Sequence, residues 1–136
     1  LVPVDEDRQI WFVHQYRHPV GKEVLELPAG VVEAGERPEV TAHREIQEEI
    51  GMGANTLHFL GSFFLAPGYS TEYMHAYLAE DLYESALQPD EDEDLRVERI
   101  SVEEAYRRLE AGELQDAKTV AALGLARSRL LRLDER

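Results

Sequence analysis

Residues 30–52 (GVVEAGERPEVTAHREIQEEIGM) contain three glutamates, Glu45, Glu48 and Glu49, within five positions. On a helix, which turns by about 100° per residue, their carboxylates would lie within an arc of roughly 100°. Each pair of like charges on such a stripe costs roughly a few tenths of a kcal/mol, and Arg44, four residues before Glu48, can offset one charge. The stripe is therefore either an acidic helix face in contact with solvent or a site that gathers cations.

The same segment carries the signals of a helix that begins at Pro38 and ends before Gly51. Proline in the first turn and glycine just past the last turn are the usual positions of both residue types. Ile46 and Ile50, with Ala42 one turn earlier, point away from the glutamate stripe. The segment therefore predicts a helix with an acidic side and a side that faces the core.

Strands and further helices are predicted around this helix. Short runs of β-branched and aromatic residues indicate strands. A capping box, SVEE, opens a helix at Ser101, and Asp116 is expected to cap the last helix. The predicted strands cover residues 10–16, 23–27, 57–65, 73–79 and 95–100, and the two later helices cover residues 101–112 and 117–132.

The mixed order of strands and helices predicts an α/β sandwich, in which helices cover both faces of a mixed sheet. The 136 residues contain no internal repeat and no linker, so we expect one domain over residues 1–136. The chain begins with Leu1 rather than Met, which leaves open whether an N-terminal segment precedes it.

Composition narrows the class of function. The 28 acidic residues against 14 basic ones argue against binding of nucleic acid through its phosphates. There are no cysteines, which excludes disulfides and thiolate metal sites and favours a reducing, cytoplasmic location. No run approaches the roughly 18 apolar residues of a membrane helix, so we expect no membrane partner. An anionic small molecule remains a possible ligand if metal cations supply the positive charge.

The glutamate stripe is part of a longer pattern, G-x5-E-x7-R-E-U-x-E-E-x-G-U, where U is apolar. It resembles the signature of the Nudix hydrolases without departure. Chance would produce the seven fixed residues on the order of once in 50,000 shuffled chains, which argues against the solvent-exposed acidic face. The matching residues are Gly30, Glu36, Arg44, Glu45, Ile46, Glu48, Glu49, Gly51 and Met52.

The resemblance implies a Nudix-type α/β/α sandwich with a loop–helix–loop catalytic motif. Oxygen donors without Cys or His suit hard cations, Mg²⁺ or Mn²⁺. By resemblance, Glu45, Glu49 and the carbonyl of Ala29 would be metal ligands, and Glu48 would be a third carboxylate ligand or a base. Arg44, together with Glu36, would brace the catalytic motif.

Residues 63–72 (FFLAPGYSTE) resemble the stretch that follows the signature in ADP-ribose pyrophosphatases. The matching positions are Pro67, Gly68 and Glu72, and in such enzymes the glutamate lies near the terminal ribose. An ordinary hairpin turn is the alternative, because Pro-Gly is common in turns.

Three further stretches are similar to the same subgroup. Arg17, in Gln-Tyr-Arg, matches an arginine that contacts phosphate, although a charge at a strand end is an alternative. Glu26 lies in LELPAG, the lead-in to the signature, and is a candidate for substrate binding. The acidic loop PDEDEDLRV supplies Glu91 and Glu93 as candidates for a base that acts on the attacking water, with a solvated loop as the alternative.

The sequence therefore predicts metal-dependent hydrolysis of a nucleoside diphosphate linked to another moiety, with ADP-ribose giving AMP and ribose 5-phosphate. Glu48, Glu91 and Glu93 remain alternative bases. Hydrolysis of GDP-sugars, dinucleoside polyphosphates or NADH is an alternative, and so is a sensor domain that binds ADP-ribose without cleaving it. The resemblance also implies a homodimer, formed with the help of an N-terminal segment.

Overall fold

The computed structural model describes residues 1–85 and 96–131. Residues 89–95 of the predicted acidic loop, with Glu91 and Glu93, lie outside the described residues. In chain order the elements are β1 (Val2–Pro3), β2 (Gln9–Arg17), the 3-10 turn η1 (His18–Val20), β3 (Lys22–Glu26), α1 (Pro38–Ile50), β4 (Met52–Phe64), β5 (Tyr73–Glu84), β6 (Arg96–Ser101), α2 (Val102–Glu110) and α3 (Ala117–Leu130).

The strands form two three-stranded sheets. One has the order β1-β5-β4, with β1 parallel to β5 and β4 antiparallel to β5; the other, β3-β2-β6, is antiparallel throughout. A bridge between Val4 and Ile10 joins them just after β1. The predicted α/β fold with mixed strand directions is confirmed, and the structure adds that the strands are divided between two sheets.

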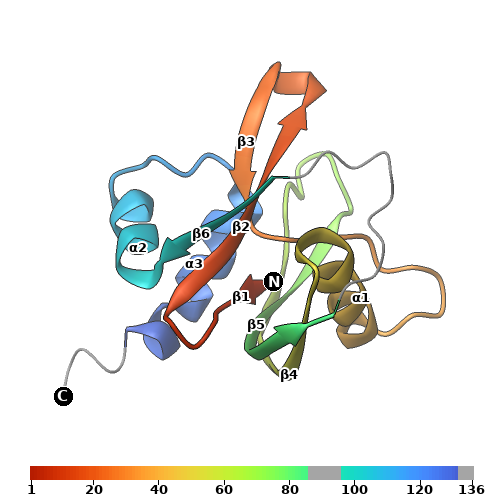
Figure 1. Cartoon of the computed structure of the whole chain (residues 1–136). Coiled ribbons are helices and arrows are strands. Elements are labelled where there is room, and N and C mark those ends of the chain that lie inside the picture. Colours follow the sequence, from red (N-terminus) through yellow and green to blue (C-terminus); the bar gives the residue numbers. More distant parts are fainter. Residues whose placement is uncertain (86–95, 132–136) are drawn as a thin grey trace.

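Helices cover both sides of the strands, as predicted. Helix α1 lies on one side, and α2 and α3 lie on the other (Figure 1). The α1 side is closed by the predicted core positions Ala42, Ile46 and Ile50, with Ile46 fully buried. The opposite side has the larger core, which includes Phe12, Leu78, Val102 and Leu123. Two apolar cores on opposite faces hold the sandwich together because each sheet face must be covered from water.

The β4–β5 hairpin is longer than the sequence predicts. Strand β4 begins directly after Gly51, which has φ 68° and ends α1 with a backbone bond to Gln47. The pairing then runs from Met52 opposite Glu84 to Phe64 opposite Tyr73. The added segments, residues 52–56 and 80–84, contain the buried Gly53 and Ala54 but otherwise polar or half-exposed residues, so local hydrophobic alternation does not mark them. Their pairing with each other makes them strands.

One predicted helix cap is confirmed and one is wrong. The hydroxyl of Ser101 accepts the backbone N–H of Glu104 at 3.1 Å. Asp116 stands at the N-cap of α3, but its side chain accepts no backbone N–H there. Its carboxylate instead accepts the hydroxyl of Thr119 at 2.6 Å and the ammonium of Lys118 at 2.9 Å. Side chains of the first helical turn therefore replace the expected backbone cap.

Candidate active site

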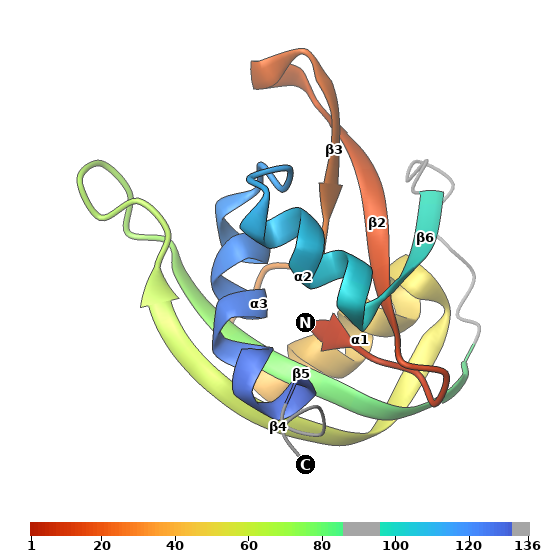
Figure 2. The ribbon, with the colours of Figure 1, turned by 90° about the vertical axis from the view of Figure 1, so that its left-hand side faces the viewer.

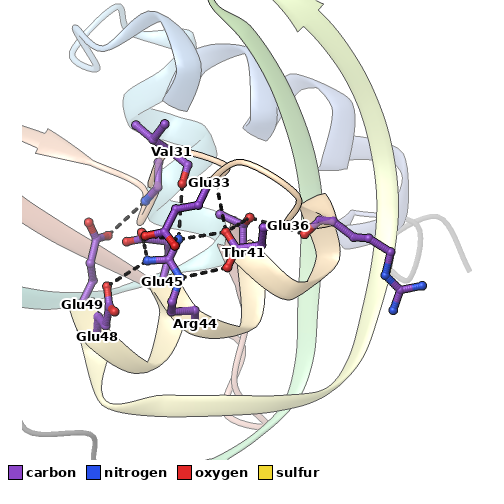
Figure 3. A network of polar contacts seen from close by, with 10 residues as sticks. Val31, Glu33, Glu36, Thr41, Arg44, Glu45, Glu48 and Glu49 are labelled. Atoms are coloured by element: carbon purple, nitrogen blue, oxygen red, sulfur yellow. Dashed lines mark hydrogen bonds and ion pairs between the residues drawn. The ribbon is translucent and has the colours of Figure 1, made fainter.

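Arg44 organises the acidic face of α1. Its guanidinium donates to Glu45 at 2.8 Å, to Glu48 at 3.4 Å and to the carbonyl of Val31 at 3.3 Å. Two further bonds, of 3.0 and 3.2 Å, reach both oxygens of Glu36 in the preceding loop. Figure 3 shows this arginine among the carboxylates of the loop and the helix. The expected ion pair between Arg44 and Glu48 is present, and the arginine also ties the loop to α1.

Glu36 is the acceptor on the loop side of this network. Besides Arg44, its carboxylate accepts the Thr41 hydroxyl at 2.5 Å and the backbone N–H of Glu33 at 3.2 Å. The bonds from Arg44, and then the bond from Thr41, lower the pKa of Glu36 to about 2. The bonds to Glu36, together with the nearby charges of Glu45 and Glu33, raise the pKa of Arg44. Thr41 is a buried residue that the sequence analysis missed, because one buried threonine in a helix carries no distinct pattern.

Two of the three clustered glutamates lie against the backbone that leads into the loop. The N–H of Ala29 donates to Glu49 at 3.0 Å. At Gly30 a Cβ atom would lie 1.9 Å from the carboxyl carbon of Glu45, so this carboxylate occupies the space where a side chain would otherwise stand. The Glu45 side chain is 13% exposed and that of Glu48 is 39% exposed. Glu45 and Glu49 are thus the inner members of the stripe.

The donor chemistry of this cluster fits a hard divalent cation. The carboxylates of Glu45, Glu48 and Glu49 and the carbonyl of Ala29 supply only oxygen atoms, the ligands that Mg²⁺ and Mn²⁺ prefer. The missing side chain at Gly30 leaves the backbone within reach of Glu45. Over residues 1–85 and 96–131, no three acidic or histidine side chains converge as a ready-made ligand set. Arg44 lies among these carboxylates, so a cation would have to compete with its bond to Glu45.

A cavity of about 730 Å³ opens beside Glu45 and Glu49. It is bounded by two projecting hairpins, β2–β3 and β4–β5 (Figure 2), by residues 29–31 and by the start of α3. Arg17 and Glu72 line it from the two hairpins. A second cavity, of about 330 Å³, shares Glu45 and Glu72 and is also lined by His75 and Tyr77. The glutamate cluster therefore lies beside a space large enough for a small anionic molecule.

The structure pairs two of the predicted substrate residues with each other. Arg17 donates through Nε and Nη2 to the two oxygens of Glu26, at 2.8 and 2.7 Å. Glu26 is only 2% exposed and also accepts the ammonium of Lys118 at 2.6 Å. Burial works to raise the pKa of Glu26, but the bonds from Arg17 and Lys118 outweigh it and lower the pKa. Lys118 was missed by the sequence analysis, because it lies 92 residues from its partner.

The other predicted site residues are distributed unevenly. Glu72 lies at the end of a turn in which the backbone N–H of Leu65 donates to the carbonyl oxygen of Glu72 at 3.2 Å. Pro67 and Gly68 form the tip of that turn and line neither cavity, so their assignment to substrate binding stays a prediction. Glu48 also lines neither cavity.

Comparison with known proteins decides the family. The model of the NUDIX domain matches residues 1–123. The chain belongs to the Nudix family. It is 38% identical over 125 residues to an ADP-ribose pyrophosphatase of Bacillus subtilis (strain 168), covering 90% of this chain and 68% of that protein. It is 37% identical, with the same coverage, to a methanol dehydrogenase activator of Bacillus methanolicus. A crystal structure of an ADP compounds hydrolase superposes with a TM-score of 0.86 at 32% identity, covering 99% of this chain and 72% of that one.

Family membership confirms the resemblance that the glutamate pattern indicated, and with it the class of enzyme. The chain is a Nudix pyrophosphohydrolase, and Nudix hydrolases use divalent metal ions. In the part of the chain that the structure describes, no helix is long and apolar enough to cross a membrane.

Proposed function

We propose that this Nudix hydrolase cleaves the diphosphate of ADP-ribose and releases AMP and ribose 5-phosphate. One observation carries the proposal: Glu45 and Glu49 lie against the backbone of Ala29 and Gly30 beside a cavity of about 730 Å³ that Arg17 also lines. A cation site and a fixed guanidinium beside one cavity suit a dianionic diphosphate. The printed names of two similar proteins, an ADP-ribose pyrophosphatase and an ADP compounds hydrolase, support an ADP-containing substrate.

Magnesium is the proposed cation, and manganese is an alternative with the same ligand preference. Glu45, Glu49 and the Ala29 carbonyl would hold it, with Glu48 as a further ligand. When bound, such a cation neutralises the diphosphate and lowers the pKa of water in the site. Negative charge exceeds positive charge in this cluster, which suits a cation site: the guanidinium of Arg44 bonds the three carboxylates of Glu36, Glu45 and Glu48.

The chain's own residues would bind and orient the diphosphate for attack by water. Arg17 would donate to a phosphate oxygen, and Glu72, across the cavity, would accept from a ribose hydroxyl. Water would form a new bond to one phosphorus while the bond from that phosphorus to the bridging oxygen breaks. A carboxylate would take the proton of the water; Glu48, Glu91 and Glu93 are the candidates. Arg44 would hold Glu45 and Glu48 in place during this step.

The proposal is tested by incubating the purified protein with Mg²⁺ and a panel of compounds at equal concentration. The panel contains ADP-ribose, a GDP-sugar, a dinucleoside polyphosphate and NADH. We expect the highest kcat/KM for ADP-ribose, with AMP and ribose 5-phosphate in equal amounts. Reaction in ¹⁸O-labelled water then shows which product carries the label and therefore which phosphorus is attacked.

Other outcomes of this assay contradict parts of the proposal. If another compound has a higher kcat/KM, the proposed hydrolysis of a diphosphate still holds, but that compound and not ADP-ribose is the preferred substrate. Tight binding of ADP-ribose that is recovered intact after hours with Mg²⁺ would instead identify a sensor domain.

We also propose that the protein is a homodimer with one Nudix domain in each chain. A monomer mass, measured by light scattering at micromolar concentration, would contradict this.

A further inference from the structure

Lys118 occupies a place where helix stability does not explain a lysine. It lies in the first turn of α3, where the helix dipole favours acidic side chains and disfavours cations. Its side chain is only 15% exposed, although an ammonium group is costly to bury unless it is paired. Twelve of the 14 basic residues in the chain are arginine, and Lys22 is the other lysine. The position of Lys118 is therefore best explained by the groups that its ammonium contacts.

Those groups are two carboxylates at the edge of the 730 Å³ cavity. The ammonium lies 2.6 Å from Glu26 Oε1 and 2.9 Å from Asp116 Oδ2. Oε1 of Glu26 is shared, because it also accepts Arg17 Nη2 at 2.7 Å. A buried carboxylate thus lies between two cations, one from the end of β2 and one from the start of α3. Lys118 neutralises part of the charge that Arg17 would otherwise have to neutralise alone.

The bond pair from Arg17 to Glu26 sets the plane of the guanidinium. Two parallel N–H···O bonds to one carboxylate fix an arginine more tightly than a single bond does. Even so, the Arg17 side chain is 43% exposed, and it lines the cavity together with Glu45 and Glu49. Arg17 is therefore anchored on its Glu26 side and accessible from the cavity.

The same turn of α3 also holds the chain that leads to the glutamate cluster. Thr119, which is fully buried, accepts the Leu27 N–H at 2.9 Å and donates to Asp116 at 2.6 Å. Two residues after Leu27, the N–H of Ala29 donates to Glu49. The start of α3 thus contacts β3 at the point where the strand leaves for the active-site loop.

We propose that Lys118 is a positioning residue for substrate binding, which acts through Glu26 to hold Arg17 available to a phosphate of the nucleoside diphosphate. This inference rests on the proposed function, in which Arg17 contacts that phosphate. Lys118 also lines the cavity, but its side chain is 15% exposed against 43% for Arg17, and its ammonium is bonded to both Glu26 and Asp116. The contact with phosphate is therefore assigned to Arg17, and Lys118 has an indirect role. Without Lys118, Arg17 would be the remaining cation bonded to Glu26 among the residues that the structure describes. The negative charge of Glu26 would then offset more of the positive charge of Arg17 and weaken its attraction for the phosphate.

The test is a double-mutant cycle on Lys118 and Glu26. Lys118→Met removes the charge and keeps most of the length, and Lys118→Arg keeps the charge. Arg129→Met is the matched control: it removes a basic side chain from an exposed position of the same helix, and Arg129 lines neither cavity. For each variant, kcat and KM for ADP-ribose with Mg²⁺ are measured, and ADP-ribose affinity is measured by calorimetry in EDTA, where no cleavage occurs.

We expect Lys118→Met to raise KM and the dissociation constant about tenfold, an effect of one charge-assisted contact, with kcat within about twofold of wild type. Lys118→Arg restores most of the affinity, and Arg129→Met has no effect. In the Glu26→Gln background, Lys118→Met adds no further loss, because the residue through which it acts has already been changed.

Two results would overturn the inference. One is a folded Lys118→Met protein with wild-type affinity; the other is a loss of similar size when Lys118→Met is added to Glu26→Gln, which would mean direct contact with the substrate. If Lys118→Met alone does not fold, the double variant, which also removes the charge of the buried Glu26, still gives the decisive comparison with Glu26→Gln. A wild-type protein that neither binds nor cleaves ADP-ribose refutes the proposed function instead.

Discussion

The carboxylate of Glu45 occupies the position that a side chain on residue 30 would need. A Cβ atom on Gly30 would lie 1.9 Å from Glu45 Cδ and 2.1 Å from its Oε1. Gly30 has no positive φ, so its role is to leave space and not to permit an unusual backbone. The chain that follows β3 can therefore approach α1 so closely that the backbone of Gly30 and the carboxylate of Glu45 lie in the same site.

The first prediction follows from that contact. Gly30→Ala forces the flexible end of Glu45 to move, so we expect the protein to fold while kcat/KM falls by about a hundredfold, or about 2.7 kcal/mol of transition-state stabilisation. Steady-state kinetics and a thermal melt separate the two effects. Gly124→Ala, in the middle of α3 with open space around it, is the control; it should keep activity and gain about 0.5–1 kcal/mol of stability. Wild-type activity in Gly30→Ala would show that the position of Glu45 is not important.

The second prediction concerns the proposed cation ligands. Glu45→Gln and Glu49→Gln keep the size of each side chain and remove a charged donor, so we expect kcat to fall by about two orders of magnitude or more. Saturating Mg²⁺ should raise the melting temperature of the wild type, because a ligand that binds only the folded state stabilises it. The same addition should raise the melting temperature of both variants much less. An equal Mg²⁺-induced shift in all three proteins would place the cation elsewhere.

The third prediction is a pH dependence of stability that comes from Glu36. The bonds from Arg44 and Thr41 lower the pKa of Glu36 from 4.5 to about 2 in the folded protein. A depressed folded-state pKa adds stability above the unfolded pKa, and this stability is lost as the pH falls from about 4.5 to about 2. Glu36→Gln lacks this contribution. Urea unfolding at several pH values should therefore show the variant less stable at pH 6, with the difference shrinking toward pH 2.

A constant difference between Glu36→Gln and wild type across that pH range would contradict the assignment. It would mean that the substitution acts through packing and not through the protonation of Glu36.

The fourth prediction tests the role of Glu72 across the cavity from Arg17. If its carboxylate accepts from a ribose hydroxyl, Glu72→Gln should raise KM for ADP-ribose by about fivefold to tenfold and leave kcat within about twofold, since the contact is the same in the ground state and the transition state. Glu80→Gln is the control, because Glu80 lies in β5 against His58 and lines neither cavity. A fall in kcat with unchanged KM would instead give Glu72 a part in the chemical step.

The sequence predicted those features that depend on residues close together in the chain. Helix α1 has the predicted bounds, Pro38 to Ile50, and its buried side is the predicted one. Proline, glycine and apolar spacing within 14 residues carry that information. The ion pair between Arg44 and Glu48 was predictable for the same reason, because residues four apart in a helix are neighbours on its surface.

The extent of the β4–β5 hairpin and the cap of α3 were not predictable in this way. Strand β5 continues to Glu84 because Met52 and its neighbours supply pairing partners up to 32 residues away. Asp116 binds Lys118 and Thr119 in place of the expected backbone N–H, and those two side chains in turn bond the end of β3. Both results depend on contacts between distant segments, which the secondary-structure propensity of a local stretch does not describe.

By itself, then, the sequence determined the family, the helix that carries the glutamates and the kind of cation they suit, because a spaced motif of charged residues and glycines lies within one short segment. Only the tertiary structure decided that Arg17 and Lys118 form one charge network around the buried Glu26 beside those glutamates. Strand ends and a helix start that are as many as 92 residues apart must meet before these charges can interact, and that meeting is set by the packing of the whole sandwich.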